Sequence, residues 1–520
     1  MAYLQPAPIR RAGLRGLANQ LSRLSSPSSF STSTSTSTST STSASPFVCR
    51  QCLKTTGQKA SAPPSLLSFL ARSRTVRQLQ APAPSSARYL SNSTSNKATS
   101  SPAASIEYAA EPAAESNDKS KSRSSSFPDT SSKSVAYWLL GSAASVFGIV
   151  VFGGLTRLTE SGLSITEWRP VTGSLPPMSA EDWESEFAKY RASPEYIKLN
   201  PHMDLDEFKK IYFMEWTHRI WGRVIGMTFV LPTIYFIARR RVTKRMAWNL
   251  VGISGLIGFQ GFIGWWMVAS GLKDDLFAPG AHPRVSQYRL TTHLSTAFVC
   301  YSWMLLAGLS ILRTHKLLAD PAAASKLVKA LSSPALAPFK RYTAALTALV
   351  FVTAMSGGLV AGLDAGLIYN EFPMMGTGIT PPSSELWDNF YSRKEDGSDL
   401  WWRNILENPS LVQLDHRMLA MTVCASVLAL FTYSRTRRVK AVLPADARKG
   451  AMGLLHLMLM QVTLGITTLI YIVPTHLAAT HQAGALALLT GALVLGSRLR
   501  IPRGTMRLVE RQLKTMQQKK

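Results

Sequence analysis

Eight long apolar stretches follow one another along the chain from about residue 135, with polar loops between them. A transmembrane helix needs about 20 mostly apolar residues, and each stretch is long enough. They cover residues 135–156, 219–238, 248–269, 290–312, 342–362, 411–433, 450–473 and 476–497. This pattern predicts an all-α membrane protein with eight transmembrane helices and argues against a soluble protein.

Residues 1–130 form a separate region that is rich in Ser, Thr, Ala and Pro, and its first acidic residue is Glu107. The first hundred residues contain no acid, and a segment that is rich in Arg and Ser and free of acids is typical of a mitochondrial transit peptide. The Ser/Thr repeat of residues 31–43 is expected to be disordered, and residues 87–94 are a candidate processing site. The "CRQC" motif (49–52) resembles half a zinc site, but we interpret it as part of the cleaved leader.

The charges of the loops predict the orientation of the helices. The loops after the second, fourth and sixth stretches are basic, as in "ARRRVTKR" (238–245), and so is the C-terminal tail. The longer loops 158–215 and 363–410 carry clusters of acids. By the positive-inside rule, both termini face the matrix and the acidic loops face the intermembrane space. Because the net charge of +27 is distributed in this way, we expect a membrane-lipid environment and no nucleic-acid partner.

The two halves of the apolar region repeat one another. Four motifs recur in the same order, and the pairs are "GGLTRLTESGL" (153–163) with "GGLVAGLDAGL" (357–367), "EWTHR" (215–219) with "QLDHR" (413–417), "QGFIG" (260–264) with "QVTLG" (461–465), and "THLSTA" (292–297) with "THQAGA" (480–485). Four helices separate the copies, so both halves have the same orientation. We therefore expect two pseudo-symmetric four-helix bundles, related by a twofold axis along the membrane normal.

Four of the nine histidines occupy positions that recur in both halves. His218 corresponds to His416, and His293 to His481, each within the first turns of an even-numbered helix. Two imidazoles at one depth of a bundle can approach a flat ring from opposite sides, which is bis-histidine haem ligation. Hydrogen-bonded core histidines are the alternative, but duplication at a common depth favours ligands of a haem iron. Zinc or copper fits less well, because a tetrahedral site needs further ligands that do not recur here.

Arginines follow the first histidine of each half. Arg219 and Arg417 come directly after these histidines and are candidate propionate-binding residues, since a guanidinium binds carboxylates through two hydrogen bonds. The alternative is an interfacial arginine that extends to water.

One position breaks the symmetry. Glu215 lies three residues before His218 on the same helical face, whereas the equivalent residue of the second half is Gln413. A carboxylate beside a haem can move a proton or stabilise positive charge, and an amide cannot. We therefore predict a catalytic role for Glu215, chemistry in the N-terminal bundle and a permanent electron-transfer haem in the C-terminal bundle. A carboxylate that merely favours the dipole of a first helical turn is the alternative.

Over about residues 135–500 the sequence resembles the mitochondrial branch of the haem A synthase family. The matching motifs are "GGLTRLTESGLSITEW" (153–168), "EWTHRIWGR" (215–223), "FQGFIGWWMVASGL" (259–272), "THL" (292–294), "LDHR" (414–417) and "THQAGA" (480–485). The resemblance implies an oxidoreductase that converts the C8 methyl group of haem O to the formyl group of haem A, which cytochrome c oxidase requires. Residues 158–215 lack the cysteine pair of many bacterial members, so a thiol-dependent step is not carried over.

The resemblance also implies roles for individual residues. His218 and His293 would flank the substrate haem, His416 and His481 would ligate a haem b cofactor, and Glu215 matches the catalytically implicated glutamate. Mitochondrial ferredoxin is the expected electron-transfer partner. We also expect contacts with haem O synthase and with assembly factors of cytochrome c oxidase, and a homo-oligomer.

These inferences define an expected layout in the mitochondrial inner membrane. The segments are a leader (1–130), an N-terminal bundle for the substrate haem (131–315), a matrix linker (316–340), a C-terminal bundle for haem b (341–500) and a basic matrix tail (501–520). The ligand ends of the helices would face the intermembrane space.

Two other functions compete with this interpretation. A bis-haem b-type electron-transfer protein would bind two haems without substrate chemistry. A transporter built from repeats would need polar groups near mid-membrane, for which Gln260 and Gln461 are the recurring candidates, although both also suit hydrogen bonds between helices. The oxygen source stays open as well, because bis-histidine ligation leaves no axial position for dioxygen and water is the alternative.

Overall fold

The computed structural model describes residues 127–278 and 282–518. Expectations for the leader, namely the transit peptide, the Ser/Thr repeat, the processing site and the CRQC motif, concern residues that lie outside this part of the chain.

Eight helices of the described residues are long and apolar enough to cross a membrane, which confirms the predicted number. They are α2 (Lys133–Leu158), α5 (Leu205–Ala238), α6 (Lys244–Val268), α7 (Gln287–Ala319), α9 (Ala337–Gly362), α12 (Pro409–Arg435), α14 (Ala445–Ile470) and α15 (Thr475–Arg498). Apart from one isolated bridge between Met375 and Gly378, the described residues form helices and no strands. The fold is therefore that of an all-α membrane protein.

Helix α5 begins earlier than the apolar pattern predicts. Asp204 caps it by accepting a hydrogen bond from the Glu207 amide (2.7 Å), and the outer turns bury Phe208 and Tyr212 against the first outward loop. His218 consequently lies about three and a half turns into the helix. The expectation that His218 belongs to the first turns is wrong, because apolar partners outside the membrane-like segment extend the helix.

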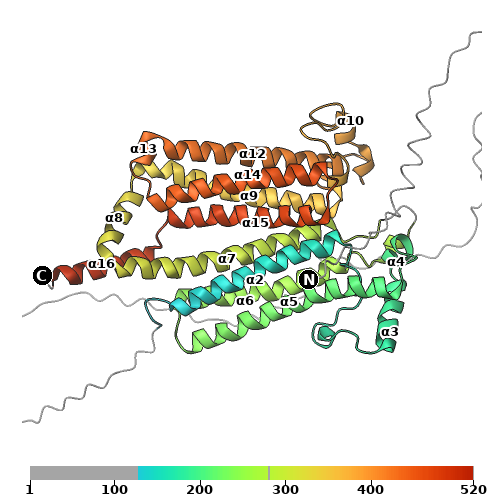
Figure 1. Ribbon diagram of the computed structural model, residues 1–520, viewed down its shortest axis with the longest axis horizontal. Coiled ribbons are helices and arrows are strands. Elements are labelled where there is room, and N and C mark those ends of the chain that lie inside the picture. Colours follow the sequence, from blue (N-terminus) through green and yellow to red (C-terminus); the bar gives the residue numbers. More distant parts are fainter. Residues whose placement is uncertain (1–126, 279–281, 519–520) are drawn as a thin grey trace, which may run out of the picture. The chain divides into compact units, whose positions relative to one another are not determined.

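Each half of the chain forms a ring of four helices. In the N-terminal half α2 packs against α5, α5 against α6, α6 against α7, and α7 returns to α2. The C-terminal half repeats this ring with α9, α12, α14 and α15 in the corresponding places, as can be followed in Figure 1. The two neighbour patterns are the same and are consistent with the predicted pseudo-symmetric bundles.

The bundles meet along α7 and α15 and through exchanged contacts. Helix α15 also packs against α2, and α7 packs against α9. Gly154 of α2 lies against Gln482, whose Nε2 donates to the Val150 carbonyl (2.9 Å). The equivalent Gly358 of α9 lies against Thr291 of α7. Small residues at both places let the backbones of the two bundles approach closely.

The chain leaves the first helix of each half in the same way. Glu160 and Asp364 occupy equivalent positions of the repeat, and both adopt a left-handed backbone with φ of 52°. The Asp364 carboxylate accepts hydrogen bonds from Arg157 (2.8 Å) and Arg284 (3.3 Å), both of the first half. Ion pairs therefore join the halves at this end of the helices.

Shorter elements lie at the two ends of the long helices (Figure 1). The outward loops contain η2 (Thr172–Ser174), α3 (Ala180–Arg191), α4 (Pro194–Leu199), η3 (Asp274–Phe277), η5 (Ala365–Leu367), α10 (Ser383–Leu386), η6 (Asn389–Tyr391) and α11 (Leu400–Glu407). The other end carries α8 (Pro321–Leu331), η4 (Pro334–Leu336), α13 (Arg437–Lys440) and α16 (Arg503–Gln518). Helices α8 and α16 occupy the predicted linker and tail and pack together through Ala324 and Val509.

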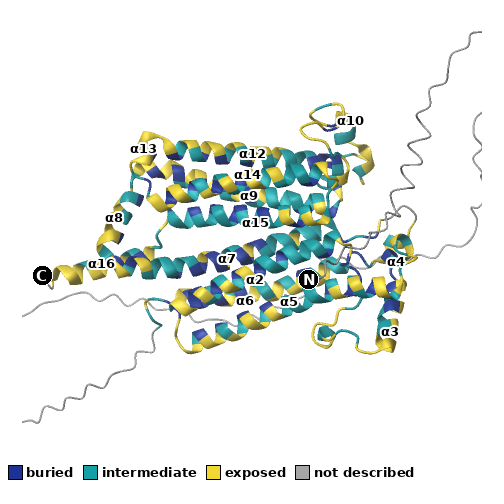
Figure 2. Ribbon diagram, viewed as in Figure 1, coloured by how far each residue is buried: buried dark blue, intermediate teal, exposed yellow. Residues whose placement is uncertain are grey.

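Large apolar side chains remain exposed along the sides of the bundles. Figure 2 shows exposed positions running along the long helices as well as in the loops. On α6 they include Phe259 (50% exposed) and Phe262 (52%). Such a surface suits hydrocarbon rather than water, which agrees with a multi-pass membrane protein.

Candidate functional site

Each of the four recurrent histidines packs against a glycine of a neighbouring helix. The rings come from α5, α7, α12 and α15 and the glycines from α2, α6, α9 and α14, so all eight long helices contribute. The pairs are His218 with Gly153, His293 with Gly264, His416 with Gly357 and His481 with Gly465. A Cβ on these glycines would lie 2.8, 3.3, 3.1 and 2.9 Å from the facing Cε1 atom, respectively. Glycine therefore lets each imidazole lie directly against a neighbouring backbone.

The two histidines of the C-terminal bundle face one another across its interior. The ring centroids of His416 and His481 are 6.5 Å apart, with an angle of 83° between the planes. Two imidazoles that bind one metal from opposite sides have centroids roughly 6 Å apart, because each metal–nitrogen bond is about 2 Å. This geometry fits the axial ligands of a haem iron.

Among the described residues, no three His, Cys, Asp or Glu side chains converge as the ligands of a metal ion would. The donor set of each pair is thus two imidazoles. A porphyrin brings its own equatorial nitrogens, so two axial protein ligands are sufficient for a haem.

Glu215 is the centre of a buried hydrogen-bond network. Its Oε2 accepts from Ser164 Oγ (2.7 Å) and from the Ile165 amide (2.8 Å). Its Oε1 accepts from the Nε (3.0 Å) and NH2 (2.6 Å) of Arg219. Arg219 also donates to the carbonyls of Ile165 (2.9 Å) and Glu167 (3.1 Å). The pair therefore attaches the segment that follows α2 to α5.

The position of Glu215 within α5 excludes one explanation of why a carboxylate occurs there. Glu215 is 3% exposed and lies well inside α5, whose first-turn acids are Asp206 and Glu207. A favourable interaction with the N-terminal dipole therefore does not account for Glu215, since that effect falls off within the first turn.

The second half repeats the arginine contact without the ion pair. Arg417 donates to the carbonyls of Tyr369 (2.9 Å) and Met374 (3.0 Å), and Tyr369 is the repeat equivalent of Ile165. Gln413 donates to the same Tyr369 carbonyl (3.0 Å). The Oε1 of Gln413 and the Nε of Arg417 are buried without a partner among the described residues. Both arginines thus hold an outward loop, but only the first neutralises a carboxylate.

Gln260 and Gln461 lie beside the second histidine of each bundle. Gln260 Nε2 donates to the His293 carbonyl (3.1 Å), and Gln461 Nε2 donates to the His481 carbonyl (2.9 Å). These are hydrogen bonds between neighbouring helices, as the sequence alternative proposed.

Two residues that contact the first histidine of each bundle were not predicted, Ser356 and Phe152. Ser356 Oγ lies 2.8 Å from His416 Nδ1. Phe152, its repeat equivalent, instead stacks on His218 with an angle of 8° between the rings. Both residues directly precede the first glycine of the repeated "GG" motif, so the alignment of the halves contained the signal.

The first outward loop contains a buried carboxyl group apart from the histidines. Glu195 is 4% exposed and accepts a hydrogen bond from Tyr190 Oη (3.1 Å), which in turn accepts one from Asn200 (3.0 Å). Burial, helped by the nearby carboxylates of Glu215 and Glu160, raises the pKa of Glu195 to about 8. The acidic loop therefore contains a group that titrates near neutral pH.

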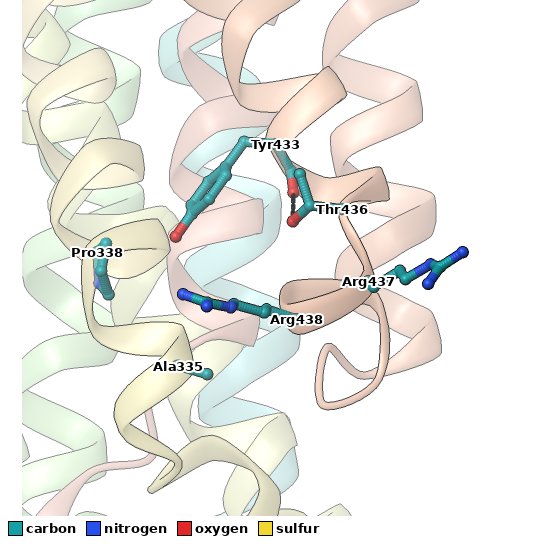
Figure 3. A pocket seen from close by; sticks show the side chains of 6 residues that line it. All are labelled: Ala335, Pro338, Tyr433, Thr436, Arg437 and Arg438. Atoms are coloured by element: carbon teal, nitrogen blue, oxygen red, sulfur yellow. Dashed lines mark hydrogen bonds between the residues drawn. The ribbon is translucent and has the colours of Figure 1, made fainter.

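A shallow pocket of about 450 Å³ lies at the other end of the C-terminal bundle. Figure 3 shows Tyr433 and Arg438 directed towards Pro338, whereas Arg437 points away. Tyr433 follows His416 on α12 by more than four helical turns, so the pocket is about 25 Å away from that histidine. It takes no part in the histidine site.

Comparison with known proteins identifies similar chains. The sequence model of a family described as "Cytochrome oxidase assembly protein" matches residues 136–493. The chain is 55% identical to the Saccharomyces cerevisiae protein named heme A synthase COX15, over 72% of this chain and 77% of the relative. It is 42% identical to the Homo sapiens protein of the same name, over 70% and 82%. It is 50% identical to a Schizosaccharomyces pombe heme A synthase–mitochondrial ferredoxin fusion protein, over 71% and 60%.

Proposed function

Because the chain belongs to the COX15-CtaA family of cytochrome oxidase assembly proteins, we propose that it is a haem A synthase. The observation that carries this proposal is the pair of histidines in each bundle, packed against glycines in the same way in both halves. The shared name of the similar proteins supports the same enzyme, which acts in the assembly of cytochrome oxidase.

The two histidine pairs would have different tasks. His218 and His293 would hold haem O, the substrate, in the N-terminal bundle. His416 and His481, whose separation suits an axial pair, would hold haem b. Haem b would supply one-electron transfer, and the bundle would keep its two imidazoles in place.

Glu215 is our candidate for the catalytic side chain. It lies one helical turn before His218 and has no charged equivalent in the second half. Arg219, Ser164 and the Ile165 amide hold its carboxylate in one position. An acid held in this way can stabilise positive charge that develops on the substrate methyl group, or accept a proton from an attacking water.

The two arginines are unequally suited to bind propionates. The Nε of Arg417 is buried and has no partner among the described residues, which supports binding of a carboxylate. Arg219 already binds Glu215 and two backbone carbonyls. We therefore favour Arg417 as a propionate ligand, and Arg219 would take this role only through its remaining donor.

The electron partner is proposed to be a mitochondrial ferredoxin. The fission yeast relative is a fusion with such a ferredoxin, which supports a direct association of the two activities. Contacts with haem O synthase, with assembly factors and with a second copy of the chain remain predictions.

We propose a location in the mitochondrial inner membrane with both termini in the matrix. The supporting observation is that basic segments such as residues 239–245 and 437–440 lie at one end of the helices, with α8 and α16. The acidic loops with α3, α4 and α11 lie at the other end, where the helices that carry the four histidines begin. Protease protection of epitopes at the C-terminus and in residues 363–410, measured in mitochondria and in mitoplasts, tests this orientation.

The decisive experiment is reconstitution of the purified full-length protein. Haem is extracted and identified, haem O and reduced ferredoxin are supplied, and haem A is measured. Haem A formation supports the proposal, whereas two retained haem b groups without conversion would favour an electron-transfer protein. Supplying isotopically labelled water or dioxygen then identifies the source of the formyl oxygen.

A further inference from the structure

The first histidines of the two bundles differ in what their Nδ1 atoms contact. In the C-terminal bundle, Ser356 Oγ donates to the Thr353 carbonyl (2.8 Å) and lies 2.8 Å from His416 Nδ1. A hydroxyl has one hydrogen, and here that hydrogen is engaged by the carbonyl. With its hydrogen on that carbonyl, Ser356 Oγ can accept the Nδ1–H of His416, and the tautomer with the proton on Nδ1 leaves Nε2 with a free electron pair for a metal.

The N-terminal bundle has no such acceptor for its first histidine. Phe152 occupies the position of Ser356 and stacks on His218, with ring centroids 6.4 Å apart. A phenyl ring offers no oxygen or nitrogen acceptor. The Nδ1 of His218 is buried and has no hydrogen-bond partner in the part of the chain that the structure describes.

The second histidines do not repeat this difference. Gln461 Nε2 lies 3.1 Å from His481 Nδ1, whereas the equivalent Gln260 reaches only the His293 carbonyl. His293 Nδ1 is buried and also lacks a described partner. Gln461 presents an N–H donor rather than an acceptor to His481 Nδ1, and the Oε1 of both Gln260 and Gln461 lacks a described partner, so the second histidines do not distinguish the two bundles. The first imidazole of the C-terminal bundle thus has a neighbour able to orient it, and the first imidazole of the N-terminal bundle has none among the described residues.

We propose that Ser356 is a positioning residue that makes His416 a permanent haem ligand, and that Phe152 keeps His218 an exchangeable one. This inference rests on the proposed function, in which one haem is a cofactor and the other enters as substrate and leaves as product. A hydrogen bond to Nδ1–H orients a ligating imidazole and makes it more basic, and losing such a bond typically lowers metal affinity about 10–100-fold. A difference of this kind favours a retained haem in the C-terminal bundle and an exchanging haem in the N-terminal bundle.

The test uses reciprocal substitutions in the full-length protein purified in detergent. Ser356→Ala removes the acceptor, and Phe152→Ser introduces one beside His218. Haem loss is followed optically after adding excess apomyoglobin as a haem acceptor, and the reduction potential of the retained haem is measured by redox titration. We expect Ser356→Ala to release haem b about 10–100-fold faster. We also expect the reduction potential of haem b to rise, because a less basic imidazole donates less electron density to the iron and stabilises the ferric state less. Phe152→Ser should slow the release of haem O added to the N-terminal bundle.

Two further variants separate positioning from folding. Ser356→Thr keeps the hydroxyl and should behave as the wild type. Ser434→Ala removes a buried hydroxyl from α12 that bonds only to the Phe431 carbonyl (2.6 Å), and it should leave haem loss and potential unchanged. If Ser356→Ala fails to fold, the Phe152→Ser measurement decides the inference from the other bundle.

The outcomes distinguish this inference from the proposed function. Equal haem release and equal potential in Ser356→Ala and the wild type would overturn the inference alone. A wild type that retains haem b but never converts haem O would overturn the proposed function. In that case, slower release of haem b from the wild type than from Ser356→Ala would still support Ser356 as a positioning residue. A wild type that binds no haem would overturn both.

Discussion

Glu215 and Arg219 lie one turn apart on α5 and form an ion pair in which 2.6 Å separate Oε1 from NH2. Only 4% of the Glu215 side chain and 18% of the Arg219 side chain are exposed, so the pair is largely removed from water. The equivalent residues, Gln413 and Arg417, form no ion pair and share only the Tyr369 carbonyl. The charged pair thus distinguishes the bundle for which we propose chemistry.

Glu215→Gln should abolish most haem A formation without loss of haem b. The amide keeps the shape of the side chain but neither takes up a proton nor stabilises positive charge as a carboxylate does, so we expect a decrease of about 10²–10⁴-fold. Haem A is quantified by chromatography of extracted haems. Glu207→Gln, at an exposed position of the same helix, is the control, and full activity of Glu215→Gln would exclude the catalytic role.

Arg219→Ala should destabilise the protein more than Arg417→Ala. The first substitution leaves a buried carboxylate without its cation, which typically costs about 3–5 kcal/mol. The second leaves the Met374 carbonyl without its donor, for which about 1–3 kcal/mol is typical, whereas the Tyr369 carbonyl still accepts from Gln413. Thermal unfolding of the purified variants, followed by circular dichroism, shows which variant loses more stability. Equal losses of stability in the two variants would contradict the importance of the ion pair.

Gly465→Ala should displace the His481 ring and weaken haem binding in the C-terminal bundle. The added Cβ would lie 2.9 Å from Cε1, closer than such contacts occur, and the ring rather than the helix backbone has to move. The control is Gly453→Ala on the same helix, where a Cβ meets nothing within 4 Å. The haem-to-protein ratio after purification should fall only in Gly465→Ala, and a fall in both variants would point to a general effect on α14.

Glu195→Gln should change how stability depends on pH. The pKa of Glu195 is raised to about 8 in the folded protein, above its ordinary value of 4.5, so the folded state holds the proton more tightly than the unfolded state. The stability that this proton contributes to the folded state is fully present below about pH 4.5 and is lost as pH rises towards about 8. Relative to wild type, Glu195→Gln should therefore gain thermal stability between these values. A difference in melting temperature that stays constant over this range would contradict the prediction.

Asp364→Asn should have a small effect despite breaking two ion pairs between the halves. The carboxylate is 47% exposed, and exposed pairs contribute about 0–1 kcal/mol because water and salt screen them. The melting temperature of the wild type should approach that of the variant as salt is added. A large loss at all salt concentrations would show that Asp364 matters through its left-handed backbone rather than its charge.

The positions of the eight helices could be predicted because each stretch is continuous, apolar and about one membrane thickness long. Their ends could not, as α5 shows. Its outer turns are polar enough to look like a loop, but Phe208 and Tyr212 find partners in α3 that lie far away in the sequence. For the same reason the sequence did not indicate that Arg219 binds the carbonyls of Ile165 and Glu167.

The sequence by itself determined the internal repeat, the four recurrent histidines and the single difference between Glu215 and Gln413, because these follow from residue identity and order. Only the tertiary structure decided which glycine each ring contacts and which atom satisfies each ring nitrogen. Those partners belong to other helices and depend on how the bundles pack. Ser356 and Phe152 are neighbours of equivalent glycines in the sequence, but they differ in function only where a ring from another helix lies beside them.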